Sequence, residues 1–376
     1  MRSPKICLVV GTRPEVIKQV PLYWALQRVF GEENVLLLST GQHRELIDQA
    51  LSHFSCQASH DLQVMKSGQS LNSLSGSLIF SLDSWLIEHK PDLVIVQGDT
   101  TTAWIAAQSC FHLKIPIAHN EAGLRSGDLK NPFPEEANRR FISVIADYHF
   151  APTERARLAL LSEGVSSEGG SKEKVFVTGN TGIDSLFWTL RQPPSHQATQ
   201  ILNEFEQNHW KLVLLTAHRR EGAGDSVKSW FQALREFLDS HPDIAIVYPY
   251  HPNQLAKQAL DEFLSHHPRV RLLSSLDYGS TCQLLAKSFF VVTDSGGILE
   301  EAVTLGVPTV VCRVTTERQE AIDAQVAVLA GYSSDGIIPA LNWARDRALQ
   351  PRKSTALFGD GQSAPRIAEH IKRFMQ

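Results

Sequence analysis

Residues 115–140, with the sequence IPIAHNEAGLRSGDLKNPFPEEANRR, indicate how the whole chain is organised. They begin as a short apolar strand and continue as a loop rich in charge, which includes His119, Glu121, Glu135 and Arg139. A loop that only turned the chain would favour Gly, Asn and Ser. Because ligands bind at the carboxyl ends of strands in open α/β sheets, we interpret this loop as part of a candidate site. The alternative is a solvated, salt-bridged surface loop.

Short apolar runs alternate with helical patterns on both sides of this stretch. This order is typical of a parallel sheet with helices on both faces, whose strands are apolar almost throughout. In the first half we expect strands at residues 5–10, 35–39, 93–97, 115–119, 148–151 and 175–178, and helices at 16–30, 44–54, 70–89 and 101–111. In the second half we expect strands at residues 211–216, 244–248, 270–273, 289–293, 308–312 and 326–329.

The length of 376 residues is large for one hydrophobic core, so we expect two domains. The pattern weakens around residues 179–208, which we interpret as a linker that contains a helix. The prediction is an α/β protein with two doubly wound, Rossmann-like domains and an interdomain cleft. We place the domains at residues 1–180 and 181–362, with a last helix in residues 363–376 that could pack back on the first domain.

Composition and charge exclude several classes of protein. Hydrophobic residues at 43% and charged residues at 20% are those of an ordinary globular protein, and the net charge of −4 argues against a nucleic-acid-binding face. No apolar run reaches the roughly 18 residues that cross a membrane, and the N-terminal run ends in a polar motif, as a first strand would. The five cysteines are widely spaced without a C-x-x-C pair. We therefore expect a reduced, cytoplasmic protein without a metal site, a nucleic-acid partner or a membrane partner.

The sequence GTRPEVIK follows the first expected strand and opens a helix. Thr12 and Glu15 have the spacing of a capping box. The exposed N–H groups of such a turn attract anions, and Arg13 and Lys18 add positive charge suited to a diphosphate. The alternative is an ordinary capped helix.

The sequence DSGG opens a helix near Ile298 in the second half of the chain. Ser295 is a suitable N-cap, and the glycines that follow it would let a ligand approach the backbone. Of Glu300 and Glu301, one could act only on the helix dipole while the other accepts from a vicinal diol such as that of ribose. No NAD fingerprint follows the first strand and no Walker A sequence occurs, so we expect a nucleotide-sugar enzyme without a cofactor.

Three carboxylates, Asp99, Glu121 and Glu135, follow neighbouring expected strands. Reversible proton abstraction needs at least one carboxylate with a tuned pKa, and clustering of carboxylates produces such tuning. The alternative for Asp99 is to cap the helix that begins near Thr101. His218 could act as a base or donate to a phosphate, although a lone histidine is more often structural.

Eight motifs occur in the order GTRPEVIK, GDTTTA, EAGLRSGD, PFPEEANRR, TGNTGIDSL, TAHRREG, TDSGGILEEA and TTER. Their combination resembles the non-hydrolysing UDP-N-acetylglucosamine 2-epimerases over nearly the whole chain. The resemblance implies a GT-B-like fold, shared with a class of glycosyltransferases, and a homodimer. It also implies reversible conversion of UDP-GlcNAc to UDP-ManNAc for surface polysaccharide synthesis. The implied route eliminates UDP across C1–C2 to give 2-acetamidoglucal, and then adds UDP back with the C2 proton delivered to the opposite face.

The resemblance also implies roles for individual residues. The catalytic positions of the family match Asp99, Glu121, Glu135, Arg139 and His218. Its UDP-binding positions match Arg13, Lys18, Ser295, Gly296, Gly297, Glu301 and Arg318. A second UDP-GlcNAc site, which activates some bacterial members, matches Gln42, Gln69, Arg219 and His251.

The chain departs from the family at several positions. Gly68 stands where some members have an allosteric arginine, so we expect weak or no activation by UDP-GlcNAc. Leu276 and Thr281 replace a glutamine and a phenylalanine that often help to hold uracil, while Tyr278 remains. Around TTER, Val314 replaces the usual aspartate, and a glutamine replaces the usual proline after it.

Four other functions remain open: a hydrolysing 2-epimerase that releases ManNAc and UDP, an epimerase for a related UDP-2-acetamido sugar, a retaining glycosyltransferase, and a non-catalytic nucleotide-sugar sensor. The intact GTRPE and PEEANRR motifs argue against the hydrolysing enzyme. The glycosyltransferase would have no obvious use for the three carboxylates, and the sensor would be expected to lack one or more of them.

Overall fold

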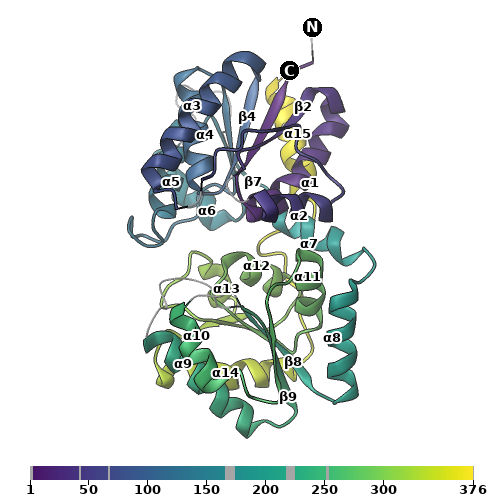
Figure 1. Ribbon diagram of the computed structural model, residues 1–376. Helices are drawn as coiled ribbons and strands as arrows, with labels where there is room; N and C mark the ends of the chain where they lie inside the picture. The colour runs from purple at the N-terminus through teal and green to yellow at the C-terminus, as the bar shows by residue number, and fades with distance from the viewer. Residues whose placement is uncertain are drawn as a thin grey trace. The chain divides into compact units, whose positions relative to one another are not determined.

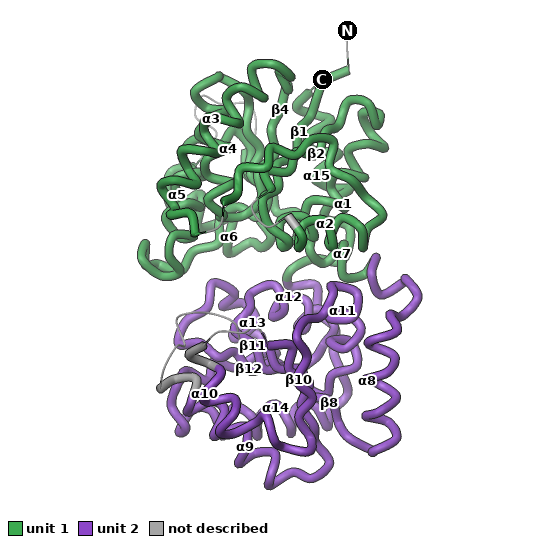
Figure 2. The backbone as a smooth tube through the Cα atoms, viewed as in Figure 1, with its two compact units in different colours: residues 1–187, 358–376 green, residues 188–357 purple. Residues whose placement is uncertain are grey.

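The structure is a computed structural model that describes residues 3–41, 44–66, 68–165, 174–216, 225–250 and 254–375. The chain divides into two compact units (Figure 2): unit 1 comprises Met1–Phe187 and Phe358–Gln376, and unit 2 comprises Trp188–Leu357. The division thus lies a few residues from the expected boundaries at 180 and 362. Residues beyond 180 belong to unit 1 because they bond to the end of the chain: the carboxylate of Asp184 accepts hydrogen bonds from the backbone N–H groups of Ser363 (3.2 Å) and Ala364 (2.9 Å).

Unit 1 is built on a parallel, seven-stranded sheet in the order β3-β2-β1-β4-β5-β6-β7. Its strands are β1 (Ile6–Val10), β2 (Val35–Ser39), β3 (His60–Asp61), β4 (Leu93–Gln97), β5 (Ile117–Asn120), β6 (Tyr148–Ala151) and β7 (Val175–Val177). All six expected strands are present with ends within two residues, and the short edge strand β3 is additional. The order is that of a doubly wound fold, with its switch point between β1 and β4.

The helices of unit 1 form two layers around this sheet. They are α1 (Arg13–Phe30), the 3₁₀ turn η1 (Glu32–Asn34), α2 (Arg44–His53), α3 (Leu71–His89), α4 (Thr101–His112), α5 (Glu135–Ile145), α6 (Glu154–Ser162), most of α7 (Thr181–Leu190) and α15 (Ser363–Met375). Helices α3, α4 and α5 share one apolar core with alternate residues of β1 and β4, and α1 lies beside α15 on the other face (Figure 1).

Unit 2 contains a parallel, six-stranded sheet in the order β10-β9-β8-β11-β12-β13. Its strands are β8 (Lys211–Thr216), β9 (Ile244–Pro249), β10 (Val270–Leu273), β11 (Phe290–Thr293), β12 (Thr309–Val311) and β13 (Ala327–Leu329). Its helices are α8 (His196–Gln207), α9 (Asp225–Ser240), α10 (Gln254–Phe263), α11 (Tyr278–Lys287), α12 (Gly296–Thr304), α13 (Gln319–Asp323) and α14 (Ser334–Ala348). The segment expected to be a linker with one helix contains both α7 and α8.

The two faces of this second sheet bury different residues of the same strands. Val213 and Leu215 of β8 pack with α9 and α14, whereas Leu212 and Leu214 pack with α8, α11 and α12. This alternation follows from the two-residue period of a strand, and both faces are apolar because both are covered by helices.

Helix α15 closes the first sheet at its β6–β7 edge. Phe374 stacks on Tyr148 with 4.0 Å between ring centroids, and His370 packs on Phe176 at 4.3 Å. The end of the chain is therefore part of unit 1. Among the described residues, no helix combines the length and the hydropathy that a membrane span requires.

Candidate functional site

The loop between β1 and α1 lies at the switch point of the first sheet. Thr12 is the N-cap of α1, but its hydroxyl donates to Glu15 (2.8 Å) and makes no capping hydrogen bond. Glu15 accepts from the backbone N–H of Gly11 (2.9 Å) and from the hydroxyl of Thr100 (2.6 Å), and burial raises the pKa of its carboxyl group. The Thr12 side chain therefore does not make the hydrogen bond to the helix backbone that a capping box requires, and this part of the prediction is wrong. Glu15 instead ties this loop, including the half-buried Arg13, to the loop after β4.

Glu121 follows β5 in the left-handed backbone region, with φ 63° and 8% of its surface exposed. The ammonium group of Lys18 donates to both of its carboxylate oxygens, at 2.6 and 2.5 Å. The side-chain amide of Gln97 donates to one oxygen, and that of Asn180 donates to the other at 3.2 Å. Donors on both oxygens favour the ionised carboxylate and hold it in one orientation. Lys18, which the resemblance assigns to UDP, is thus a direct partner of Glu121.

Asp99 follows β4 and pairs with a different cation. Arg139 of α5 donates from Nε to Asp99 Oδ2 at 3.1 Å, and its Nη2 donates to the same oxygen. The N-cap of α4 is Thr100, whose hydroxyl accepts from the backbone N–H of Ala103 at 3.0 Å. The alternative that Asp99 caps this helix is therefore wrong. The Asp99 side chain remains 27% exposed, so a ligand could reach its carboxylate.

The two glutamates that begin α5 have different surroundings. Glu136 is fully buried and accepts from Arg139 (3.1 Å), Arg140 (3.0 Å) and the backbone N–H of Ser126 (3.0 Å). Glu135 is the first residue of α5 and is half-buried. It lies four residues before Arg139, which places the two side chains on the same face of the helix. Glu136 anchors the loop, and Glu135 is the more accessible carboxylate.

His119 lies beneath the carboxylates at the end of β5. Its Nε2–H donates to the backbone oxygen of Gly98 at 2.7 Å. Burial lowers the pKa of His119 to about 4, against the opposing effect of the charges on Asp99 and Glu121. The imidazole is therefore neutral at pH 7, and both carboxylates lie close enough to influence it.

The turn before α12 has the form that the sequence predicts. Ser295 is the N-cap and accepts from the backbone N–H of Ile298 at 3.5 Å, although the helix begins at Gly296 rather than near Ile298. A Cβ atom at Gly296 would lie 2.6 Å from the guanidinium carbon of Arg318, so only glycine lets that cation lie against the start of the helix. A Cβ atom at Gly297 would meet open space.

Glu300 and Glu301 each have a defined partner. The buried carboxylate of Glu300 accepts from Nε of Arg318 at 2.7 Å. Glu301 accepts from the phenol of Tyr278 at 2.8 Å, and burial raises the pKa of that phenol well above its usual value. Both glutamates therefore bond to a side chain, and the expectation that one of them acts only on the helix dipole is wrong. Leu276, at one position where the chain departs from the family it resembles, is buried in the core under α8 and α11.

Several predicted residues lie outside the described residues, namely Gln42, His218, Arg219 and His251. Of the possible allosteric set, Gln69 is described: it donates to the hydroxyl of Ser77 at 3.2 Å and accepts from the backbone N–H of Lys66 at 3.2 Å. Gly68 has φ 72°, and no atom lies within 4 Å of the position that its Cβ would occupy. Space for a side chain is present there, but the backbone conformation disfavours one.

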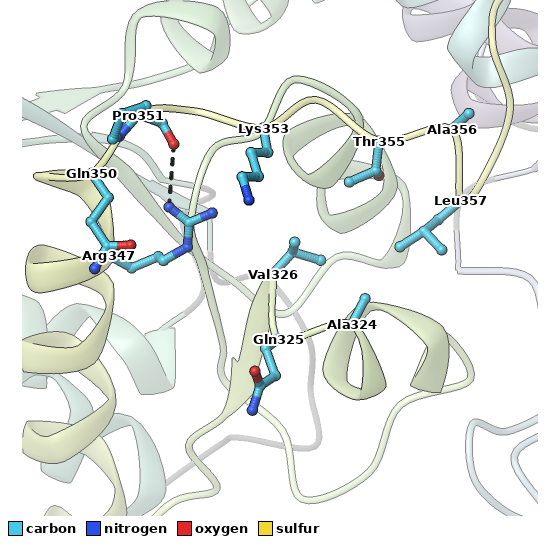
Figure 3. A pocket seen from close by; sticks show the side chains of 10 residues that line it. All are labelled: Ala324, Gln325, Val326, Arg347, Gln350, Pro351, Lys353, Thr355, Ala356 and Leu357. Atoms are coloured by element: carbon cyan, nitrogen blue, oxygen red, sulfur yellow. Dashed lines mark hydrogen bonds between the residues drawn. The ribbon is translucent and has the colours of Figure 1, made fainter.

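A cavity of about 740 Å³ in unit 2 is lined by none of the predicted residues (Figure 3). It lies between the start of β13 and the chain segment after α14, so it opens at the amino edge of β13, whereas ligands of such sheets bind at the carboxyl edge. Arg347 reaches the backbone oxygen of Pro351 at 3.5 Å on one side of it. Within the described ranges, no group of three or more His, Cys, Asp or Glu residues is placed to hold a metal ion.

Sequence reasoning missed three amides around Glu121, namely Gln97, Asn120 and Asn180. Gln97 and Asn120 are the last residues of β4 and β5, and both are almost completely buried. A buried polar residue at the last position of a central strand was the available signal, because such groups are nearly always hydrogen-bonded.

Comparisons with known proteins identify the family of the chain. The family model described as UDP-N-acetylglucosamine 2-epimerase matches residues 30–372. The chain is 38% identical over 374 residues to the UDP-N-acetylglucosamine 2-epimerase of Bacillus subtilis (strain 168), covering 99% of this chain and 96% of the relative.

Solved structures extend this agreement to the fold. A crystal structure of UDP-GlcNAc 2-epimerase from Neisseria meningitidis bound to UDP-GlcNAc matches with a TM-score of 0.88 at 38% identity, over 98% of this chain and 100% of that one. A glycosyltransferase from Streptomyces nogalater shares the fold alone, with a TM-score of 0.55 at 16% identity over 99% of this chain and 100% of that one. The expected GT-B-like pair of Rossmann-like domains is confirmed, and the chain belongs to the UDP-N-acetylglucosamine 2-epimerase family.

Proposed function

We propose that this protein interconverts UDP-GlcNAc and UDP-ManNAc by inverting C2 without hydrolysing the sugar nucleotide. The C2–H proton passes to an enzyme base, the C1–O bond breaks, and UDP leaves with the bonding electrons to give 2-acetamidoglucal. In the second step, the C2 carbon receives a proton on the opposite face and UDP adds back at C1. The reaction is redox-neutral, so we expect it to proceed without added NAD or metal.

The observation that carries this proposal is a pair of carboxylates at neighbouring strand ends, each paired with a different cation. Asp99 bonds to Arg139, and Glu121 bonds to Lys18. Two acid–base groups near one sugar carbon suit a reaction that removes a proton from one face and returns it on the other. Glu135, on the same face of α5 as Arg139, is the third candidate in our assignment.

We assign nucleotide binding to the α12 turn of unit 2. The N–H groups at the start of this nine-residue helix, with Arg318 against them, would attract a diphosphate. Glu301, oriented by Tyr278, has lone pairs for the two hydroxyls of a ribose. Arg13, in the first turn of α1 in unit 1, is a separate candidate in our assignment for binding phosphate.

Proton NMR of UDP-GlcNAc incubated with the protein in D₂O tests the proposal. We expect UDP-ManNAc to form and deuterium to appear at C2 of both sugars. Free ManNAc and UDP as the only products would instead identify the hydrolysing enzyme. UDP binding with neither product nor exchange would favour a non-catalytic sensor.

We also propose that the protein is a homodimer, associated through an apolar face of unit 1. Helices α3, α4 and α5 lie side by side (Figure 1), and their outer surface exposes large apolar side chains. Phe80 (78% exposed) and Val144 (81%) stand out most from this surface, and Ile87, Phe111 and Phe141 are also exposed. An exposed apolar face of this kind can pair with its own copy around a two-fold axis.

Analytical ultracentrifugation of Phe80→Glu and Val144→Glu tests the dimer. We expect each variant to weaken association, because the new charge would be buried against an apolar partner. Leu158→Glu on α6 is the matched control, since Leu158 is also exposed and apolar but lies outside this face. A monomeric wild-type protein at micromolar concentration, or dimers unaffected by both substitutions, would contradict the proposal.

With Gly68 in place of an arginine, we propose that activation by UDP-GlcNAc is weak or absent. The initial rate of the reverse reaction from UDP-ManNAc, with and without trace UDP-GlcNAc, measures it. A long lag that the trace addition abolishes would show a working second site.

A further inference from the structure

Two buried amides connect the end of β4 with the end of β5. Gln97 and Asn120 are register partners in the parallel ladder between these strands, so their side chains stand next to each other. The Asn120 amide nitrogen donates to the Gln97 side-chain oxygen at 2.8 Å and to the hydroxyl of Thr181 at 3.1 Å. All three residues are at most 2% exposed, so their polar groups have to be satisfied within the protein.

These amides close a ring of hydrogen bonds with Glu121. The backbone N–H of Glu121 donates to the Asn120 side-chain oxygen at 3.0 Å. Asn120 donates onward to Gln97, and Gln97 donates to Oε2 of the Glu121 carboxylate. The ring therefore begins at the backbone of Glu121 and ends at its own side chain.

The direction of each hydrogen bond in this ring follows from chemistry. A backbone N–H can only donate, so the oxygen of the Asn120 amide has to face it. The Asn120 nitrogen then faces Gln97, whose oxygen must accept, and this leaves the Gln97 nitrogen to face the carboxylate. Asn180 is oriented in the same way, because its oxygen accepts from the backbone N–H of Gly182 at 2.9 Å and its nitrogen faces Glu121.

We propose that Gln97 and Asn120 are positioning residues of the epimerisation, which hold the Glu121 carboxylate in one orientation and present it with a fixed N–H donor. This inference rests on the proposed function, since it concerns how Glu121 handles the C2 proton. An amide that could rotate would present oxygen to the carboxylate in half of its orientations, and the ring removes that freedom. The neighbouring amides thus hold the Glu121 carboxylate in one orientation and offer it N–H donors, which favour its ionised form.

The substitution Gln97→Glu separates this role from a purely structural one. At high pH the introduced carboxyl is ionised, repels Glu121 and cannot donate to it. At lower pH the introduced carboxyl takes up a proton, and it then offers a donor and an acceptor in the same places as the amide. Because two adjacent carboxylates share a proton readily, this recovery should begin above the usual titration range of glutamate.

The other charged groups around this position are the same in both proteins. The charged groups are Lys18 from α1 and Asp99 after β4 with its partner Arg139 from α5. The titratable His119 on β5 is neutral, and Arg125 lies near its imidazole. The ratio of variant to wild-type turnover therefore isolates the introduced group. At pH 8.5 we expect kcat to fall by about ten- to a hundredfold, the equivalent of one charge-assisted hydrogen bond, with KM little changed. Toward pH 6 the ratio should rise several-fold.

Gln97→Met is the companion variant, with a similar shape and no donor. It should also lower kcat, but its ratio to wild type should not recover as the pH falls. Gln57→Glu, at an exposed position of unit 1, controls for the added charge and should behave as wild type. UDP affinity, measured by calorimetry, confirms for each variant that a folded, nucleotide-binding protein is compared.

Wild-type turnover in both variants, or an identical pH dependence of the two, would overturn the positioning role while leaving the proposed function intact. Absence of C2 exchange in the wild-type protein would instead remove the proposed function itself. If Gln97→Glu does not fold, the fall in kcat of Gln97→Met with unchanged UDP affinity still supports the proposal, and unchanged kcat refutes it.

Discussion

The substitution Lys18→Met asks whether Lys18 serves the carboxylate or the nucleotide. The resemblance assigns this lysine to UDP, yet the structure places its ammonium 2.6 and 2.5 Å from the two oxygens of Glu121. Methionine keeps most of the length of the side chain and removes the charge. We expect the variant to lose turnover while its affinity for UDP changes less than about twofold, equivalent to under 0.5 kcal/mol.

The magnitude follows from what remains around Glu121. Removing one partner of a buried ion pair typically costs about 3–5 kcal/mol. Here the carboxylate keeps its donors from Gln97 and Asn180, and the Lys18 side chain is 16% exposed, so water reaches part of the site. We therefore expect the free energy of unfolding to fall by the lower end of this range, about 3 kcal/mol. For kcat we expect a fall of about a hundredfold, the lower end of what general acid–base catalysis contributes, because Glu121 stays in place but loses its cation.

The assay combines steady-state kinetics in both directions with calorimetric titration of UDP. Lys372→Met on the exposed side of α15 is the control for loss of a surface charge. We also expect the effects of Lys18→Met and Glu121→Gln on the free energy of unfolding to be less than additive in a double-mutant cycle. Lys18→Met leaves the Glu121 carboxylate without its cation, and Glu121→Gln removes that charge. A tenfold or larger rise in the Kd for UDP together with unchanged kcat would refute this reasoning.

Three further predictions concern the nucleotide half-site, the carboxylates and a buried histidine. Arg13→Ala and Glu301→Ala should each raise the Kd for UDP about ten- to a hundredfold in calorimetry, since each removes a charge-assisted hydrogen bond; unchanged affinity in both would contradict the half-site. Asp99→Asn and Glu135→Gln should each lower turnover by roughly 10²–10⁴-fold with UDP binding retained, and a variant impaired only in re-addition should release 2-acetamidoglucal; near-normal turnover in both would remove them from the mechanism. Burial lowers the pKa of His149 to about 3. Between about pH 6.5 and pH 3, this histidine therefore binds a proton in the unfolded chain but not in the folded chain, which destabilises the folded wild type as the pH falls. Between pH 7 and 4.5, His149→Leu should therefore lose about 2–3 kcal/mol less of its free energy of unfolding than wild type does. Equal losses in the two proteins, measured by urea unfolding, would contradict this.

The architecture was accessible to sequence reasoning because its signals are local. A strand covered on both faces is apolar at nearly every position, and a parallel connection places a helix between two such strands. The central strands β2, β4, β6 and β8 accordingly have the predicted ends. The edge strand β3 was missed because two residues carry no period, and the helix pair α7–α8 was read as a linker because its flanks are rich in proline and polar residues.

Several candidate residues could also be identified from the sequence, because they are polar and follow directly after a strand. The partners to which their side chains bond could not be predicted in this way. Lys18 and Glu121 are 103 residues apart, and Asp99 and Arg139 are 40 apart. Which cation meets which carboxylate depends on the order of strands in the sheet and on where each crossover helix packs, and neither is encoded in any short window of residues. The ring through Gln97 and Asn120 depends further on the register between β4 and β5, since a shift by one residue would turn the two amides to opposite faces of the sheet. The sequence by itself thus determined the fold class and the edge of the sheet at which the candidate residues lie, whereas the tertiary structure decided which groups hold each carboxylate there.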